Sequence, residues 1–185
     1  SKAASFLRHP QTMRVFRQWN GNSVLVSEGQ AWLRNRRLLA PAFVPQHIDR
    51  YAACMVDRVE RSFPQPVEDL DVVQALVPLT LGIFCAAMFD LHDDLPDLQA
   101  DLQSLAEIAM LELFLPWPLP LWLPFPLVRR KRRVIARLRA LVEELIARKS
   151  ARRGEDLLSF LLATSEEGER LSPTQLRDEM VTLLL

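Results

Sequence analysis

Residues 24–43 read VLVSEGQAWLRNRRLLAPAF, and this stretch decides the fold more than any other. Ser27 and Gln30 have the spacing of a capping box, in which a hydroxyl accepts a free N–H and the later side chain reaches back. Good helix formers follow, and Pro41 cannot continue a helix because it lacks an N–H and its ring fixes φ. The stretch therefore predicts a capped helix that ends near Ala40.

Two donor side chains lie one turn apart in this predicted helix. Trp32 and Arg36 are four residues apart, which places them on one helical face. An indole N–H only donates, and a guanidinium is a fork of donors that matches carboxylates. The pair therefore predicts a site for one dianionic group. A tryptophan that packs on the core, capped by an arginine, explains the same spacing and stays open here.

The end of the chain carries the clearest helix start. Residues 171–185 read LSPTQLRDEMVTLLL. Ser172 can cap, Pro173 occupies the first helical position, and Gln175 closes the capping box. We expect a helix that still runs at the last residue.

Hydrophobic spacing predicts the remaining helices. The run Val72–Phe89 carries no charge and, with 18 residues, is long enough to suggest a membrane span. Pro78, Gly82 and the polar Gln74 and Thr80 weaken that interpretation, so we expect a helix that is apolar all round and buried in a helical core. The other predicted helices cover residues 10–18, 46–63, 94–113, 134–150 and 156–164.

Composition supports a mainly α-helical chain. The 185 residues are 49% hydrophobic and 25% charged, which excludes intrinsic disorder. With five glycines and one tyrosine, the chain has few of the residues that form the turns and strands of β-hairpins. Lys+Arg 23 and Asp+Glu 23 balance to a formal charge of zero, so no excess of positive charge marks a nucleic-acid partner.

The cysteines and histidines show no metal-ligand pattern. Cys54 and Cys85 are too few for a disulfide or metal framework and lie in apolar helical runs, so we expect buried free thiols. His9, His47 and His92 have no ligand spacing. No metal ligand is therefore assigned.

Residues 113–133 combine an apolar loop with a basic run. Leu113–Val128 is wholly apolar and holds five prolines, which forbid a regular helix there. Five basic residues, 129–133, follow at once. An apolar surface beside cations is what a peripheral membrane contact requires. A loop that folds onto its own protein, followed by the solvated start of a helix, is the alternative.

The stretch 24–43 resembles helix C and the preceding loop of the cytochrome P-450 heme-thiolate monooxygenases. Trp32 and Arg36 match the family's W-x-x-x-R motif, and the R-R-L-L-x-P-x-F tail also matches. Residues 171–185 are similar to the start of the family's helix I, and residues 155–162 resemble its helix H. The resemblance covers essentially all 185 residues, from helix B to early helix I.

The resemblance implies a cytochrome P-450 fold of which residues 1–185 are an N-terminal portion, with an incomplete helical core. The ends look cut, so we expect one segment of a single domain, truncated at the start of helix I. The family's A-G-x-D/E-T-T motif, its E-x-x-R pair and the cysteine that ligates iron come later. Neither Cys54 nor Cys85 lies in an F-x-x-G-x-R-x-C-x-G loop, so we expect the thiolate ligand outside this segment, which alone is inactive.

By the same resemblance, Trp32 and Arg36 bind the propionates of heme b. Val24 and Leu25 reach toward the heme and limit the substrate, while Val181 and the terminal Leu185, one turn apart, form the opposite wall. A core role for these four residues stays open.

The family reaction inserts one oxygen atom from O2 into an apolar small-molecule substrate, with electrons from a redox partner, a ferredoxin or a flavoprotein reductase. We expect a cytoplasmic enzyme from the Ala-, Arg- and Leu-rich composition. The rival hypothesis is a non-catalytic helical protein that binds a ligand or a partner between its apolar helices. It explains the composition but not the order of the motifs.

Overall fold

The computed structural model describes residues 8–63, 69–92, 96–151, 156–163 and 171–184. Regular structure within these ranges is entirely helical, which confirms the prediction of a mainly α fold. The elements follow in the order α1 (Pro10–Asn20), α2 (Gly29–Leu39), the 3-10 helix η2 (Ala40–Phe43), α3 (Pro45–Ser62), α4 (Val72–Phe89), α5 (Pro96–Leu113), α6 (Pro126–Ala151), α7 (Leu157–Ala163) and α8 (Pro173–Leu184).

Side-chain caps set two of the helix starts, and the cap at α8 was predicted. At α8 the Gln175 N–H donates to the Ser172 hydroxyl at 3.2 Å, and the Ser172 N–H donates to the Gln175 side chain at 3.3 Å. At α4 the Asp71 carboxylate accepts the N–H groups of Val73 and Gln74, each at 3.1 Å. Both caps satisfy N–H groups that a helix leaves without an internal partner.

The predicted capping box at Ser27 is wrong. Helix α2 begins at Gly29, and its N-cap, Glu28, makes no side-chain capping bond. The Ser27 N–H instead donates to the Ser23 carbonyl at 3.0 Å, which closes a turn before the helix starts. The Ser27 hydroxyl is buried by this turn without a hydrogen-bond partner among the described residues. Gly29 has φ of +57°, a conformation that favours glycine, and this residue redirects the chain into α2.

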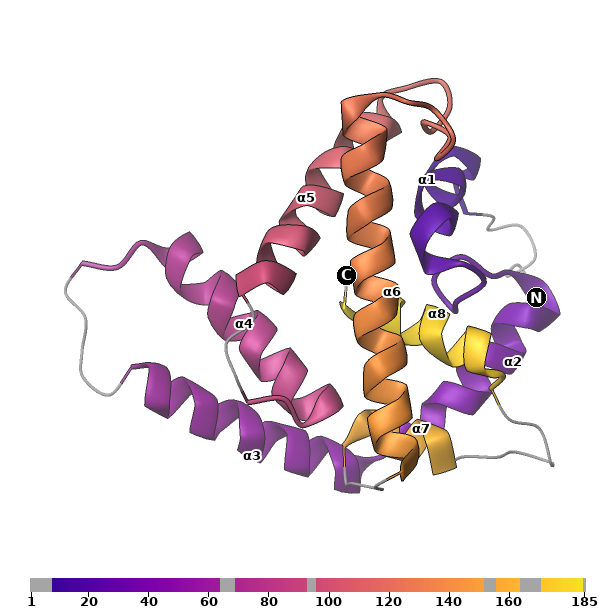
Figure 1. The fold of residues 1–185 in the computed structure, drawn as a ribbon. Helices are drawn as coiled ribbons and strands as arrows, with labels where there is room; N and C mark the ends of the chain where they lie inside the picture. Colours follow the sequence, from indigo (N-terminus) through magenta and orange to yellow (C-terminus); the bar gives the residue numbers. More distant parts are fainter. Residues whose placement is uncertain (1–7, 64–68, 93–95, 152–155, 164–170, 185) are drawn as a thin grey trace.

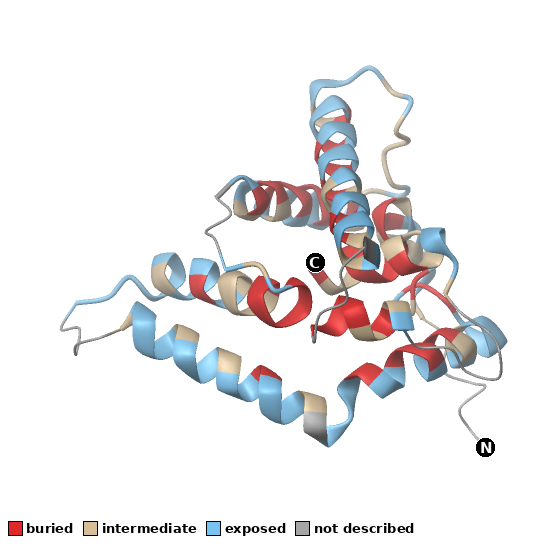
Figure 2. Cartoon of the chain, turned by 60° about the horizontal axis from the view of Figure 1, so that its bottom comes forward, coloured by how far each residue is buried: buried red, intermediate tan, exposed pale blue. Residues whose placement is uncertain are grey.

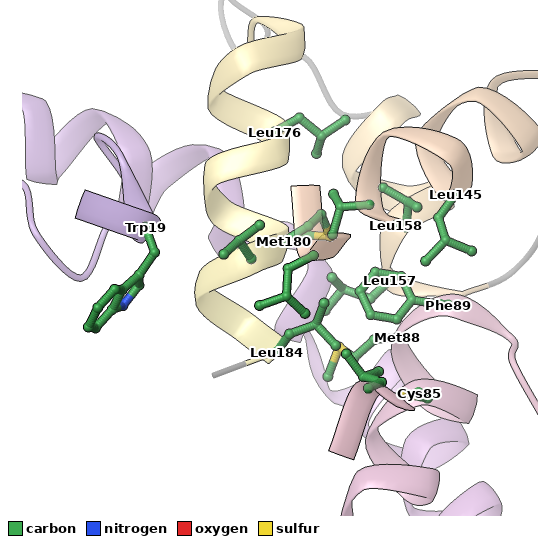
Figure 3. Packing of buried hydrophobic residues seen from close by; sticks show 14 of the residues in the cluster. Trp19, Cys85, Met88, Phe89, Leu145, Leu157, Leu158, Leu176, Met180 and Leu184 are labelled. Atoms are coloured by element: carbon green, nitrogen blue, oxygen red, sulfur yellow. The ribbon is translucent and has the colours of Figure 1, made fainter. Parts of the chain in front are cut away.

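Helix α6 stands at the centre of the fold, where it contacts α5, α7 and α8 (Figure 1). Its buried apolar side chains recur at helical spacing, as an amphipathic helix requires. They are Val128, Val134, Ile135, Leu138, Val142 and Leu145. Helices α7 and α8 fill the space on this face, and Figure 3 shows Met180 and Leu184 of α8 close to Leu157 of α7 and Phe89 of α4.

Helices α3 and α4 pack against each other and extend to one side of α6 (Figure 1). The last turns of α4 are buried, whereas its first turns expose Val72, Val73, Leu76 and Val77. The expectation of a helix buried all round is therefore wrong for its first half. Within the described ranges, α4 is also the one helix long and apolar enough to cross a membrane, and a third of it is buried inside the protein.

Helix α3 matches the predicted range closely, but most of its apolar side chains are exposed (Figure 2). Tyr51 is the one buried side chain among the described residues of α3. Cys54, on the same helix, is half-buried, so the expectation of a buried thiol is met only by Cys85. Burial raises the pKa of Cys85 to about 11, which keeps this thiol protonated.

A buried ion pair joins α5 to α6 below the loop that connects them. The Lys131 ammonium lies 2.6 Å and 2.7 Å from the two carboxylate oxygens of Glu112, and both side chains are fully buried. Lys131 also donates to the Gln18 side chain at 2.9 Å and lies 5.1 Å from the centre of the Trp19 ring. Glu112 accepts the N–H of Leu119 in the loop at 3.0 Å.

The alternative in which residues 129–133 are the solvated start of a helix therefore does not hold for Lys131. Its neighbours Arg129, Arg130, Arg132 and Arg133 are exposed. Burial lowers the pKa of Lys131, and the bond to Glu112 opposes that shift. The pair could not be predicted from local sequence patterns, since the two residues lie 19 positions apart.

Breaking this pair should destabilise the protein strongly. Lys131→Met leaves the Glu112 charge buried without its cation, so the free energy of unfolding should fall by about 3–5 kcal/mol. The double variant Glu112→Leu with Lys131→Met removes both charges and should be more stable than Lys131→Met alone. Denaturant unfolding of the full-length protein measures these differences.

The exposed pair of Glu144 and Arg148 supplies the matched control. Glu144→Ala should lower the free energy of unfolding by less than about 1 kcal/mol. A loss for Lys131→Met as small as that of the control would contradict the structural role of the buried pair.

Candidate functional site

The two predicted anion-binding side chains meet on α2. The Arg36 guanidinium carbon lies 5.1 Å from the centre of the Trp32 ring, which is cation–π geometry. Trp32 is half-buried and Arg36 is exposed. No acidic side chain in the described part of the chain pairs with Arg36. The guanidinium and the indole N–H are therefore oriented by each other at the surface, and their donors remain available to an external anion.

A tight turn, residues 20–26, leads from α1 to the segment before α2. The Ser23 N–H donates to the Asn20 carbonyl at 3.1 Å, and the Asn35 side chain on α2 donates to the Asn22 carbonyl at 2.9 Å. The turn is thus attached to the helix that carries Trp32 and Arg36. We call residues 20–26 the 20–26 turn.

Val24 and Leu25, two of the predicted substrate residues, lie in the 20–26 turn. Val24 is half-buried against the core, and its carbonyl accepts a bond from Arg8 at 3.2 Å. Leu25 is 41% exposed. An apolar side chain at the surface, next to the helix of the cation–π pair, can contact a ligand there, but the substrate role of both residues stays a prediction.

Of the two residues predicted on α8 for the opposite wall, the structure describes Val181 alone, and the substrate role of both residues stays a prediction. Val181 is buried and belongs to the hydrophobic core cluster. Its surroundings match the core role that the sequence left open. Leu185 lies outside the described residues.

Two carboxylates of α8 hold the 20–26 turn, and sequence reasoning did not identify them. The Val24 N–H donates to the Glu179 carboxyl group, at 2.8 Å and 3.0 Å from its two oxygens. The Asn22 N–H donates to Asp178 at 3.1 Å. Glu179 is fully buried, and desolvation raises its pKa to about 7. A strongly perturbed carboxyl group close to predicted site residues is a signal that only the fold reveals.

An apolar groove of about 990 Å³ runs between α1, α4, α5 and α8. Its lining includes Phe16, Phe84, Leu102, Met110 and Leu183. Neither Val24, Leu25 nor Val181 lines it. Residues from four helices line the groove, so no single stretch of sequence could indicate it.

The loop between α5 and α6 leaves its aromatic side chains in solvent. Phe114 is 84% exposed, Trp117 65%, Trp122 77% and Phe125 54%. Leu121 is the side chain of this loop that packs partly on the core. In the alternative, the loop folds onto its own protein, but these four side chains do not pack on the described residues in that way.

Comparisons with known proteins point to one family. The family model of cytochrome P-450 matches residues 1–185. Cyclooctat-9-en-7-ol 5-monooxygenase of Streptomyces melanosporofaciens is 30% identical over 178 residues, which cover 91% of this chain and 39% of the relative. Cyclooctatin synthase of the same organism is 30% identical over 177 residues, which cover 89% of this chain and 38% of the relative. The chain thus spans about two fifths of the length of these curated relatives.

A solved structure shares the fold. The retinoic acid-bound cyanobacterial CYP120A1 superposes with a TM-score of 0.76 over 97% of this chain and 40% of that chain, at 23% sequence identity. This partial coverage agrees with the prediction of an N-terminal portion of the fold. With a family model that matches every residue and a solved relative that shares the helical arrangement, the chain belongs to the cytochrome P-450 family.

Proposed function

We propose that this chain is part of a heme-dependent monooxygenase that inserts one oxygen atom from O2 into a small apolar molecule. The family membership and the monooxygenase relative support this assignment. The observation that carries it within the chain is the Trp32–Arg36 pair, since its donors are mutually oriented and have no acidic partner among the described residues. Residues 1–185 would be one part of a single domain and inactive alone.

The donor set fits the carboxylates of heme b. Arg36 would donate a charge-assisted bond to a propionate, and the Trp32 indole N–H would donate a second bond. The heme, when bound, supplies the oxygen-activating chemistry. The protein residues bind and orient it, and the positive charge of Arg36 offsets the negative charge of the propionates.

The proposed substrate is small and apolar. Leu25 offers an exposed apolar side chain beside α2, and the groove between α1, α4, α5 and α8 offers a larger apolar surface. Burial of apolar groups is the main source of affinity for such a ligand. Electrons would come from a ferredoxin or a flavoprotein reductase, and the proposed location is the cytoplasm.

Reconstitution of the full-length protein with heme separates this function from its rival. A reduced carbon monoxide complex with the absorption band of a thiolate-ligated heme supports the monooxygenase. A folded helical protein that takes up no heme supports the non-catalytic ligand- or partner-binding protein instead.

Loss of the Arg36 guanidinium should weaken heme retention. In the full-length protein, Arg36→Ala removes a charge-assisted bond worth about 1.5–3 kcal/mol, so heme transfer to an acceptor protein should quicken about ten- to a hundred-fold. Trp32→Phe keeps the ring but removes the N–H, and should give a smaller increase in the same direction. Helical content, measured by circular dichroism, should not change.

Arg37→Ala is the matched control, because Arg37 is an exposed arginine on the same helix, next to Arg36. Its heme retention should equal that of the wild type. Unchanged retention in both Arg36→Ala and Trp32→Phe would refute the propionate assignment.

We further propose a peripheral membrane contact through residues 113–133. Four exposed aromatic side chains lie on the loop, and four exposed arginines follow in the first turns of α6. Apolar burial in the lipid interface and attraction to anionic head groups add together. The two features are continuous in the chain, which supports one contact surface.

Removing the two loop tryptophans should reduce this contact. Trp117→Ser with Trp122→Ser removes most of the exposed indole surface, so binding of the full-length protein to anionic vesicles at low salt should fall by at least about tenfold. Co-sedimentation measures the bound fraction. Val56→Ser on α3, also an exposed apolar position, is the control and should bind as the wild type does. Wild-type protein that fails to sediment with anionic vesicles would rule the contact out.

A further inference from the structure

A hollow of about 910 Å³ lies between α1 and the loop that joins α5 to α6. Its described lining is rich in cationic side chains, which are Arg8, Arg14 and Arg17, with His9 beside them. Pro118 lines it from the side of the loop. The three arginines belong neither to the Trp32–Arg36 pair nor to the apolar groove, so the hollow is a separate feature of the surface.

Hydrogen bonds hold the loop beside α1. Gln11 of α1 donates to the carbonyl of Glu112 at 3.2 Å and to the carbonyl of Leu115 (Figure 1). Lys131, in the second turn of α6, donates to the side chain of Gln18 at 2.9 Å. These bonds fix the separation between α1 and the loop, so the hollow between them is part of the fold.

Two of the three arginines are held in place by the 20–26 turn. Arg8 donates to the Val24 carbonyl and Arg17 donates to the Val26 carbonyl, each at 3.2 Å. In the described part of the chain, neither guanidinium makes a second bond. A guanidinium carries five donors, so both groups are oriented by one bond and keep donors for a ligand.

The protein does not balance the positive charge of the hollow. Within the ranges that the structure describes, no carboxylate pairs with the guanidinium of Arg8, Arg14 or Arg17. Glu28 is the acidic residue of the described lining, and it accepts the backbone N–H of Arg8 at 3.1 Å. Three guanidinium groups against one carboxylate leave two positive charges in excess. Like charges gathered on one surface repel one another unless an anion binds among them.

The remaining lining narrows the class of anion. Pro10, Met13 and Pro118 lie among the arginines, so the hollow offers apolar contacts as well as charge. Trp117, next to Pro118 in the chain, is 65% exposed, and tryptophan is typical of the interface between membrane and water. A phosphate monoester carries a charge of about −1.5 to −2 at pH 7, which matches the excess of two positive charges.

We propose that Arg8, Arg14 and Arg17 bind the head group of an anionic lipid that carries a phosphate monoester, as phosphatidic acid does. Guanidinium groups match phosphate oxygens in geometry and bind them through charge-assisted hydrogen bonds. The choice of a lipid as the source of the phosphate rests on the membrane contact proposed for residues 113–133. The site is independent of the heme assignment.

Titration of the full-length protein with short-chain lipids, kept below the concentration at which they form micelles, tests the site without a membrane. Dihexanoyl phosphatidic acid carries the phosphate monoester, and dihexanoyl phosphatidylglycerol carries a singly charged diester. The dissociation constant from isothermal titration calorimetry should be about tenfold lower for the monoester, because its second charge strengthens the bonds to the arginines. Inorganic phosphate should bind at least about tenfold more weakly than dihexanoyl phosphatidic acid, because it buries no apolar surface.

Arg14→Ala separates the site from the fold, because Arg14 is exposed and makes no hydrogen bond within the described ranges. Its affinity for dihexanoyl phosphatidic acid should fall about tenfold, and most of the preference for the monoester should be lost. Arg129→Ala is the matched control, since Arg129 is also an exposed arginine near the loop but does not line the hollow. It should keep the wild-type preference for the monoester.

The outcomes distinguish the site from the functions proposed above. Equal affinity for the two short-chain lipids, or no binding of either, would overturn the site. An equal loss of affinity in Arg14→Ala and Arg129→Ala would also overturn it, because general attraction to positive charge would then explain the binding. Inorganic phosphate that binds as tightly as dihexanoyl phosphatidic acid would overturn the lipid as the source.

Two further readouts separate failures of the different proposals. Binding of dihexanoyl phosphatidic acid by a protein that does not sediment with anionic vesicles would support the head-group site and refute the membrane contact through residues 113–133. The reduced carbon monoxide spectrum of Arg14→Ala should equal that of the wild type, so the heme assignment is tested separately.

Discussion

Helix α8 has to bury apolar side chains and two carboxyl groups at the same time. Leu176, Met180 and Leu184 enter the core, while Asp178 and Glu179 hold the 20–26 turn. A buried carboxyl group is costly unless it is hydrogen-bonded, so the turn must stay in place for the helix to pack. The core and the 20–26 turn therefore share contacts with the same helix.

A buried ion pair joins the elements at the opposite end of the fold. The Glu112–Lys131 pair joins the last turn of α5 to the second turn of α6, and it also bonds to Gln18 of α1 and to Leu119 of the connecting loop. The loop beyond it exposes its aromatic residues. The buried pair anchors the base of a loop whose aromatic side chains are exposed. Such an arrangement suits a contact surface for a substrate or a lipid, because little conformational entropy of the protein is then lost on binding.

Sequence patterns predicted the helices and the Trp32–Arg36 pair because both depend on neighbours within one or two turns. The caps at Asp71 and Ser172 are local in the same sense. The capping box predicted at Ser27 was wrong because the Ser27 N–H donates to the Ser23 carbonyl, and the helix begins two residues later, at Gly29.

What the sequence could not show depends on partners far along the chain. From the sequence, Lys131 was one cation in a run of five and Glu179 was not singled out, whereas the fold places Glu112 beside the first and Val24 beside the second. The first half of α4 differs in the opposite direction, because its apolar composition indicated burial but its side chains are exposed. The chain spans about two fifths of the length of its relatives.

We propose that the Trp32–Arg36 pair holds the carboxylates of a heme. A structure of the full-length protein with heme bound tests this role through the distance from the Arg36 guanidinium to the nearest propionate oxygen. We expect a charge-assisted hydrogen bond of about 2.7–2.9 Å, with the Trp32 indole N–H donating to the same group. Propionates held by other side chains, with Arg36 still stacked on Trp32 and directed to solvent, would contradict it.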